Sequence, residues 1–158
     1  MASGKEIIYD GAGVAGKIQV TADKYTLDEL DARVRSALRN CGQKAVDDAK
    51  ETLKNKKHKQ TGLLVNSVAY SISGEEASIK TYKADEPDKN GIIQKGEYNG
   101  TETEAYGGKY VLYVGSKVFY APYIECGTPT FKGDPYLKPA IANNGDKFRK
   151  TIHEELNG

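Results

Sequence analysis

The sequence has no tryptophan, one methionine, two histidines and two cysteines, so it has few of the side chains that usually carry catalysis or bind metals. Cys41 and Cys126 lie far apart and form no CxxC pair. His153 begins HEEL, which lacks the second histidine of a zinc-binding HExxH helix, and no GxSxG nucleophile elbow occurs. We therefore expect no catalytic residues, no cofactor and no metal site, and a protein that is not an enzyme.

An excess of charge of one sign is also absent. Lysine and arginine number 23 against 22 acidic residues, a net charge of +1, whereas nucleic-acid-binding proteins usually show a strong basic excess. No apolar run approaches the roughly 18 residues that cross a bilayer, and the N-terminus has no apolar core of secretory type. We expect one domain over residues 1–158, no membrane association and a reduced cytosolic environment.

Two short segments near the N-terminus favour β structure. Residues 5–9 (KEIIY) and 17–21 (KIQVT) are rich in β-branched and aromatic residues, so residues 1–25 are predicted to form a hairpin or extension. The linker GAGVAG (11–16) matches the dinucleotide-binding fingerprint. That site requires a helix to begin at the third glycine, whereas KIQVT favours a strand, so we interpret the linker as a turn.

A long amphipathic helix is predicted next. Thr26 is a candidate N-cap, and Glu29 completes a capping box. The helix has about eight turns, with Cys41 in its apolar stripe, and Gly42 favours a bend at a cost of about 1 kcal/mol relative to alanine. Apolar residues recur at steps of three and four, at Leu27, Leu30, Val34, Ala37, Leu38, Cys41, Ala45, Ala49 and Leu53.

Period-two alternation follows the helix. It runs through Leu64, Val68, Tyr70 and Ile72 and predicts one strand, and ASIKTY (77–82) predicts a second strand antiparallel to it. Between residues 75 and 104 there are eight acidic side chains and four lysines. The polar segment 83–108 is predicted to be a long acidic loop or an extended hairpin.

The last third of the chain completes an α+β fold. YVLYV (110–114) is apolar throughout, as in a strand covered on both faces. Residues 120–141 contain four of the five prolines and favour neither a simple helix nor a simple strand. Ile141, Phe148 and Ile152 then predict a closing helix, interrupted near Asn143–Gly145. We expect the long helix to pack on a small antiparallel sheet, with this helix closing the fold.

Three local patterns carry a resemblance. They are QTGLLVNS (60–67), YAPYIECGT (120–128) and PYLKPA (135–140). In this order they resemble the tail-component or neck-protein family of long-tailed bacteriophages, which includes proteins similar to minor tail protein Z. The resemblance covers about residues 27–156. The positions that match are Thr61, Gly62, Leu64, Ser67, Tyr120, Ala121, Tyr123, Glu125, Gly127, Thr128, Pro135, Tyr136, Leu137, Pro139 and Ala140.

Two positions depart from the family pattern. Tyr136 stands where phenylalanine is commoner, and Cys126 stands where the family often has an aromatic residue. The resemblance implies a structural part of the virion at the head–tail junction or tail, assembled in the host cytoplasm. It implies a homo-oligomeric ring of about six or twelve subunits around the DNA channel. Its partners would be head-closure, tail-terminator or tail-tube proteins, and genomic DNA that passes without sequence recognition.

Other interpretations stay open. Glu125 either hydrogen-bonds the backbone or nearby hydroxyls to hold segment 120–141, or is an exposed carboxylate. The acidic segment either faces the channel and repels DNA phosphates or faces a neighbouring ring. The basic run Lys54–Lys59 suggests an alternative function, a small DNA-binding or regulatory module, or it is a solvated helix end. A phage-release hydrolase lacks an identifiable nucleophile or metal site.

Overall fold

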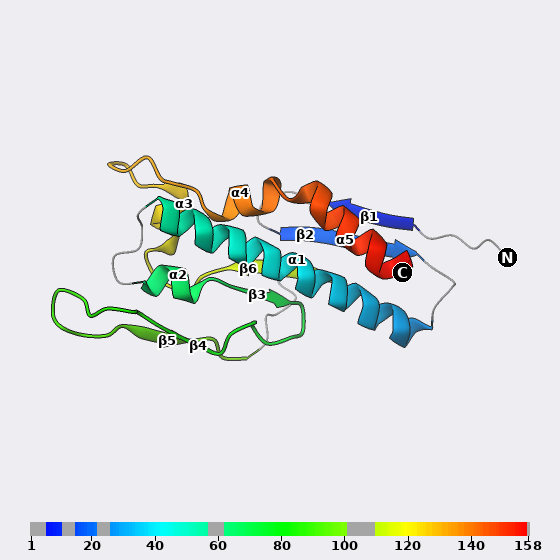
Figure 1. The fold of residues 1–158 in the computed structure, drawn as a ribbon, viewed down its shortest axis with the longest axis horizontal. Helices are drawn as coiled ribbons and strands as arrows, with labels where there is room; N and C mark the ends of the chain where they lie inside the picture. Colours follow the sequence, from blue (N-terminus) through cyan, green and yellow to red (C-terminus); the bar gives the residue numbers. More distant parts are fainter. Residues whose placement is uncertain (1–5, 11–14, 22–25, 57–61, 101–109, 158) are drawn as a thin grey trace.

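The computed structural model describes residues 6–10, 15–21, 26–56, 62–100 and 110–157. The chain has the predicted α+β architecture, in which a long helix packs against a small antiparallel sheet and a C-terminal helix packs along the long helix (Figure 1). The elements are β1 (Glu6–Asp10), β2 (Ala15–Thr21), α1 (Leu27–Asn55), α2 (Leu63–Ser67), β3 (Ala69–Ile72), β4 (Thr81–Lys83), β5 (Lys95–Glu97), β6 (Val111–Gly115), α3 (Ala121–Cys126), α4 (Leu137–Ala142) and α5 (Gly145–Asn157).

The main sheet has the strand order β1-β2-β6-β3, and every neighbouring pair is antiparallel. β1 and β2 pair as the predicted hairpin. Gly16, the third glycine of GAGVAG, lies inside β2 opposite Leu112 of β6. It therefore does not open a helix, and the backbone lacks the arrangement that a dinucleotide pyrophosphate requires.

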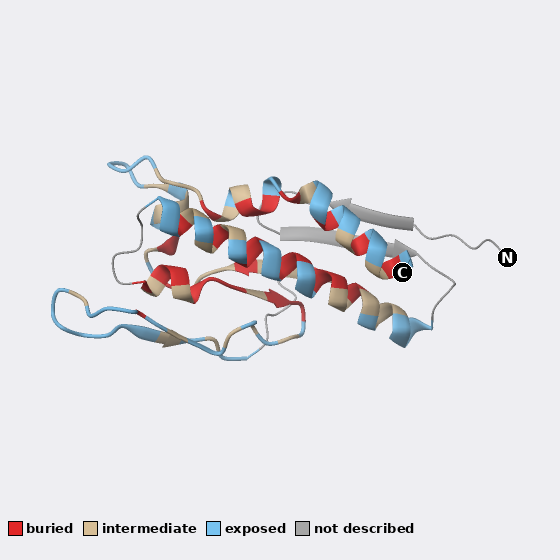
Figure 2. Ribbon diagram, in the orientation of Figure 1, coloured by how far each residue is buried: buried red, intermediate tan, exposed pale blue. Residues whose placement is uncertain are grey.

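Helix α1 begins with the predicted capping box. The Thr26 Oγ1 accepts the Glu29 backbone N–H at 3.2 Å, and the Glu29 carboxylate accepts the Thr26 N–H at 3.0 Å. The apolar stripe from Val34 to Leu53 is buried against the sheet and the C-terminal helices (Figure 2). Leu27 does not belong to this stripe, because its position in the first turn leaves it 85% exposed.

Gly42 has a different role from the predicted bend. Helix α1 is continuous through it. A Cβ atom at this position would lie 2.6 Å from Cγ of the Tyr70 ring and 2.9 Å from a methyl group of Leu112. Glycine is therefore required because the helix approaches β3 and β6 closely at this point.

Two predictions for the strands are wrong. Residues 63–67 form helix α2, because Gly62 turns the chain and the four-residue spacing of Leu64 and Val68 fits a helix as well as a strand. β4 does not pair with β3; it pairs with β5 in a separate two-stranded sheet, while β3 pairs with β6. The acidic segment thus contains an extended hairpin, one of its two predicted forms.

β6 is a central strand but is not covered along both faces. Val111 and Val114 are buried, whereas Leu112 and Tyr113 are half-buried. The predicted interruption near residue 144 is confirmed, because α4 ends at Ala142 and α5 begins at Gly145. Asn144 fixes this corner, since its amide donates to Asp48 of α1 at 2.6 Å and to the Ala140 carbonyl at 2.7 Å.

Candidate functional site

The first sequence pattern forms the turn into α2. Gly62 has φ of 82°, and a Cβ there would lie 2.4 Å from the Asp85 carboxylate, so both backbone conformation and space favour glycine. Leu64 is buried. The buried Ser67 hydroxyl bonds the Leu64 carbonyl at 2.7 Å and the Ser116 hydroxyl at 2.6 Å. Thr61 lies outside the described residues.

The second pattern forms helix α3 and the tight loop after it. Tyr120 precedes the helix and is half-buried, Ala121 is buried, and Tyr123 is 54% exposed. Gly127 ends the helix with φ of 86°, and a Cβ there would lie 2.5 Å from the Phe131 carbonyl oxygen. The expectation that segment 120–141 contains no regular structure is therefore wrong, because its prolines and glycines mark the ends of two short helices.

The third pattern starts α4, and the second pattern holds it in place. The Glu125 carboxylate accepts the backbone N–H groups of Tyr136, Leu137 and Lys138 at 2.8, 2.9 and 2.9 Å. This confirms the predicted backbone role of Glu125. Pro135 contributes its carbonyl to Lys56 at 3.3 Å. Leu137 and Pro139 are half-buried, while Ala140 is buried.

All three patterns meet near the Tyr136 side chain, which is 1% exposed. Burial raises the pKa of its phenol well above the usual range, and the nearby Glu125 carboxylate adds to the shift. Burial also raises the pKa of the neighbouring Tyr120 phenol, while a hydrogen bond with the Leu64 backbone opposes the shift. Among the described residues, no hydrogen-bond partner lies within reach of the Tyr136 hydroxyl.

Tyr98 completes this junction, and the sequence gave little sign of its role. Its hydroxyl donates to the Ser67 carbonyl at 2.7 Å and accepts the Lys117 N–H at 3.2 Å. Its ring lies 5.5 Å from that of Tyr82. One side chain of the acidic segment thus ties the β4–β5 hairpin to α2 and to the link between β6 and α3. The only signal in the sequence was an aromatic residue in a polar stretch.

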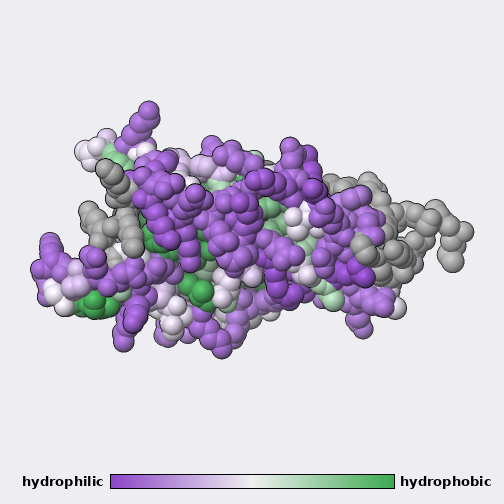
Figure 3. Space-filling view, viewed as in Figure 1, coloured by the Kyte–Doolittle hydropathy of each residue, from purple (hydrophilic) through white to green (hydrophobic). Residues whose placement is uncertain are grey.

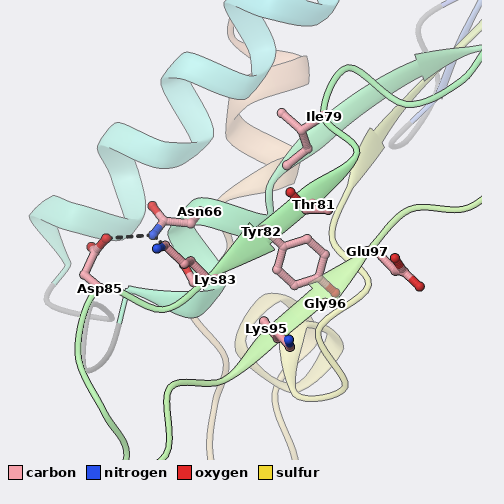
Figure 4. A pocket seen from close by; sticks show the side chains of 9 residues that line it. All are labelled: Asn66, Ile79, Thr81, Tyr82, Lys83, Asp85, Lys95, Gly96 and Glu97. Carbon is pink, nitrogen blue, oxygen red and sulfur yellow. Dashed lines mark hydrogen bonds between the residues drawn. The ribbon is translucent and has the colours of Figure 1, made fainter.

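The β4–β5 hairpin and α2 enclose a surface cleft of about 860 Å³ (Figure 4). Asn66 lies at one side, where its amide donates to the Lys83 carbonyl and to the Asp85 carboxylate, both at 2.9 Å. The Tyr82 ring covers Gly96 on the opposite strand, where a Cβ would lie 2.4 Å from the phenol oxygen. The cleft carries charges of both signs, so its electrostatics do not favour one class of ligand.

The basic run is partly engaged within the fold. Lys56 forms an ion pair with Asp134 in the loop before α4. Residues 57–59 lie outside the described part of the chain. In that described part, no group of His, Cys, Asp and Glu side chains is arranged to hold a metal ion. Nor does any helix there combine the length and the apolar character needed to span a membrane.

These features define an α+β protein whose three sequence patterns form one packed structural junction. Comparison with family models, with curated proteins and with solved structures finds no match to this chain. The function is therefore argued from the sequence patterns, their geometry and the surfaces described above.

Proposed function

We propose that this chain is a structural virion protein of a tailed bacteriophage, located at the head–tail junction as a neck or tail-completion subunit. It assembles into a homo-oligomeric ring around the DNA channel. One observation carries the proposal: three patterns spread over residues 60–140 pack around the single side chain of Tyr136. The resemblance was stated from the order of these patterns, and a shared structural role gives that order a physical reason.

The surface is consistent with a protein that works by assembly. Six large apolar side chains are exposed among the described residues, five of them in the β4–β5 hairpin, in α3 or in the segments on either side of α3: Ile92, Ile93, Phe119, Tyr123 and Phe131. Exposed apolar side chains that gather in particular segments are typical of protein–protein contacts. The partners are other copies of the chain and the adjoining neck and tail proteins, such as head-closure, tail-terminator or tail-tube proteins.

DNA is a passing cargo in this proposal. A near-neutral chain provides no strong basic surface for phosphate binding, and Lys56 is already paired with Asp134. The acidic side chains of segment 83–108 would repel the DNA backbone if they face the channel, or contact an adjoining ring if they face outward.

The test is light scattering on purified protein over a concentration series, with negative-stain imaging of the largest species. Closed rings with a central hole wide enough for duplex DNA are expected. A monomer at every concentration, combined with DNA binding that weakens steeply as salt increases, would contradict the proposal and favour the DNA-binding module instead.

A further inference from the structure

The free end of the β4–β5 hairpin is a built turn that exposes two isoleucines. The Asp88 carboxylate accepts the backbone N–H groups of Asn90 and Ile92 at 2.8 and 3.0 Å and the Gln94 amide at 2.8 Å. Ile92 is 55% exposed and Ile93 is 43% exposed. Because Asp88 satisfies the polar groups of the turn, both side chains are presented in a preorganised position, which lowers the entropy cost of docking. We call Ile92 and Ile93 the hairpin tip; Figure 3 shows an apolar patch at this end of the hairpin.

A second apolar surface surrounds α3. Phe119, Tyr123 and Phe131 are 82%, 54% and 39% exposed, and we call them the aromatic face. Phe131 is fixed by the loop that carries it, since the Thr128 hydroxyl accepts its backbone N–H at 3.0 Å. Aromatic side chains are enriched at protein–protein interfaces, because they bury much apolar area with little loss of side-chain freedom.

The two surfaces have complementary charge. The hairpin beside its tip carries exposed acidic groups, Asp85 and Glu86. The segments of the aromatic face carry exposed lysines, Lys117, Lys132 and Lys138.

The acidic residues of these lysine-bearing segments are already engaged within the fold. Glu125 accepts the N–H groups at the start of α4, and Asp134 pairs with Lys56. The aromatic face therefore presents a basic rim, and the hairpin tip has an acidic one.

The positions of the two surfaces suit contact between neighbours. The end of the hairpin and the loop after α3 project at the same end of the long axis, on opposite edges of the molecule, while both chain termini lie at the other end (Figure 1). When copies stand side by side, the lower edge of one faces the upper edge of the next. Such a contact joins two different surfaces, and it closes into a ring when the rotation between copies divides a full turn.

We infer that the hairpin tip of one copy docks on the aromatic face of a second copy of this chain. The inference rests on the proposed ring and specifies its subunit contact. Ile92 and Ile93 supply the apolar contact, and the acidic and lysine side chains around them set the orientation and the rate of association.

The first experiment weakens the contact without changing the core. Ile92→Asp together with Ile93→Asp is expected to weaken self-association at least tenfold, roughly the effect of losing one buried isoleucine contact. Leu27→Asp is the matched control, since Leu27 is 85% exposed at the start of α1. All three proteins should have the same circular dichroism spectrum. Association of the double variant equal to that of the control would overturn the inference.

The second experiment identifies the two surfaces directly. Ile93→Cys and Phe131→Cys are each made in a Cys126→Ser background, given different tags, mixed and treated with a short bis-maleimide. Cross-links between the two variants are expected to exceed cross-links within either one. Links only between two Ile93→Cys chains would overturn the inference, because they would show a tip-to-tip pair; absence of any link would also overturn it.

The same samples separate this inference from the proposed function. Closed rings in negative-stain images without the mixed cross-link would overturn the subunit contact and leave the ring in place. Mixed cross-links in open chains or dimers, without rings, would support the contact and contradict ring formation.

Discussion

The Glu125 carboxylate and the backbone N–H of Tyr136 form a hydrogen bond of 2.8 Å that joins α3 to the start of α4. The same carboxylate also accepts the next two N–H groups of the chain. The first N–H groups of a helix have no partner within it, so one glutamate from α3 satisfies the open end of α4. A charged acceptor makes these bonds stronger than neutral ones.

Replacing Glu125 with alanine should therefore weaken the fold. We expect Glu125→Ala to lower the free energy of unfolding by about 2 kcal/mol, since three N–H groups lose a charged acceptor. Urea unfolding followed by circular dichroism measures the change. Glu51→Ala, at an exposed site on α1, is the control and should change stability by less than about 0.5 kcal/mol. Unchanged unfolding together with unchanged assembly would contradict a positioning role for Glu125.

The Tyr136 hydroxyl gives a prediction of opposite sign. The ring is buried, and the hydroxyl has no hydrogen-bond partner among the described residues. Removing the hydroxyl as Tyr136→Phe should leave stability unchanged or raise it by about 1 kcal/mol, because an unpaired polar group leaves the core. Tyr136→Ala should lower stability by about 3–5 kcal/mol through loss of the ring. A loss above about 1 kcal/mol for the phenylalanine variant would show that the hydroxyl has a partner.

Gly42 and Gly145 form a matched pair of helix glycines. A Cβ at Gly42 would approach the Tyr70 ring to 2.6 Å, whereas none of the surroundings of Gly145 lies within 4 Å. Gly42→Ala should lower the unfolding free energy by about 1–3 kcal/mol, despite the better helix propensity of alanine. Gly145→Ala should be neutral or slightly stabilising. Thermal melting of both variants checks this, and equal effects would contradict close packing of α1 on the sheet.

The two thiols should differ in reactivity. Cys41 is buried beneath α5, and burial raises the pKa of its thiol to about 12, so almost no reactive thiolate forms at neutral pH. Cys126 is exposed. Disulfide exchange with an aromatic disulfide reagent should modify one thiol in the native protein and both in denaturant. Cys126→Ser should abolish the native reaction; fast modification that persists in this variant would show that Cys41 is accessible.

The hairpin turn should depend on pH through Asp88. Its hydrogen bonds from the Gln94 amide and from the Ile92 and Asn90 N–H groups lower the pKa of the Asp88 carboxyl below its ordinary value. A lowered folded-state pKa gives stability that is present above the ordinary value of about 3.9 and is lost as pH falls through the folded pKa.

Amide hydrogen exchange at Asn90 and Ile92, compared between pH 6 and pH 3 after correction for intrinsic rates, measures this loss. Asp88→Asn should show weak protection at both pH values. Protection that does not change with pH in the native protein would contradict a structural role for the carboxylate.

Local patterns predicted the helices well and predicted the strand pairing poorly. The capping box at Thr26 and Glu29 and the apolar period of α1 involve residues three or four positions apart, so the sequence displays them directly. The pairing of β3 with β6 joins residues about 40 positions apart and leaves no local mark. For the same reason, Tyr98 and the ion pair between Lys56 and Asp134 were missed.

The sequence by itself determined the α+β class, both ends of α1, the break before α5 and the order of three short patterns. These features depend on backbone conformation and on side-chain periods within a few residues. Tertiary structure alone decided why position 42 must be glycine, that Glu125 caps α4, and that the three patterns meet at Tyr136. Those outcomes depend on which surfaces pack together, because close approach and burial arise only when distant segments share one core.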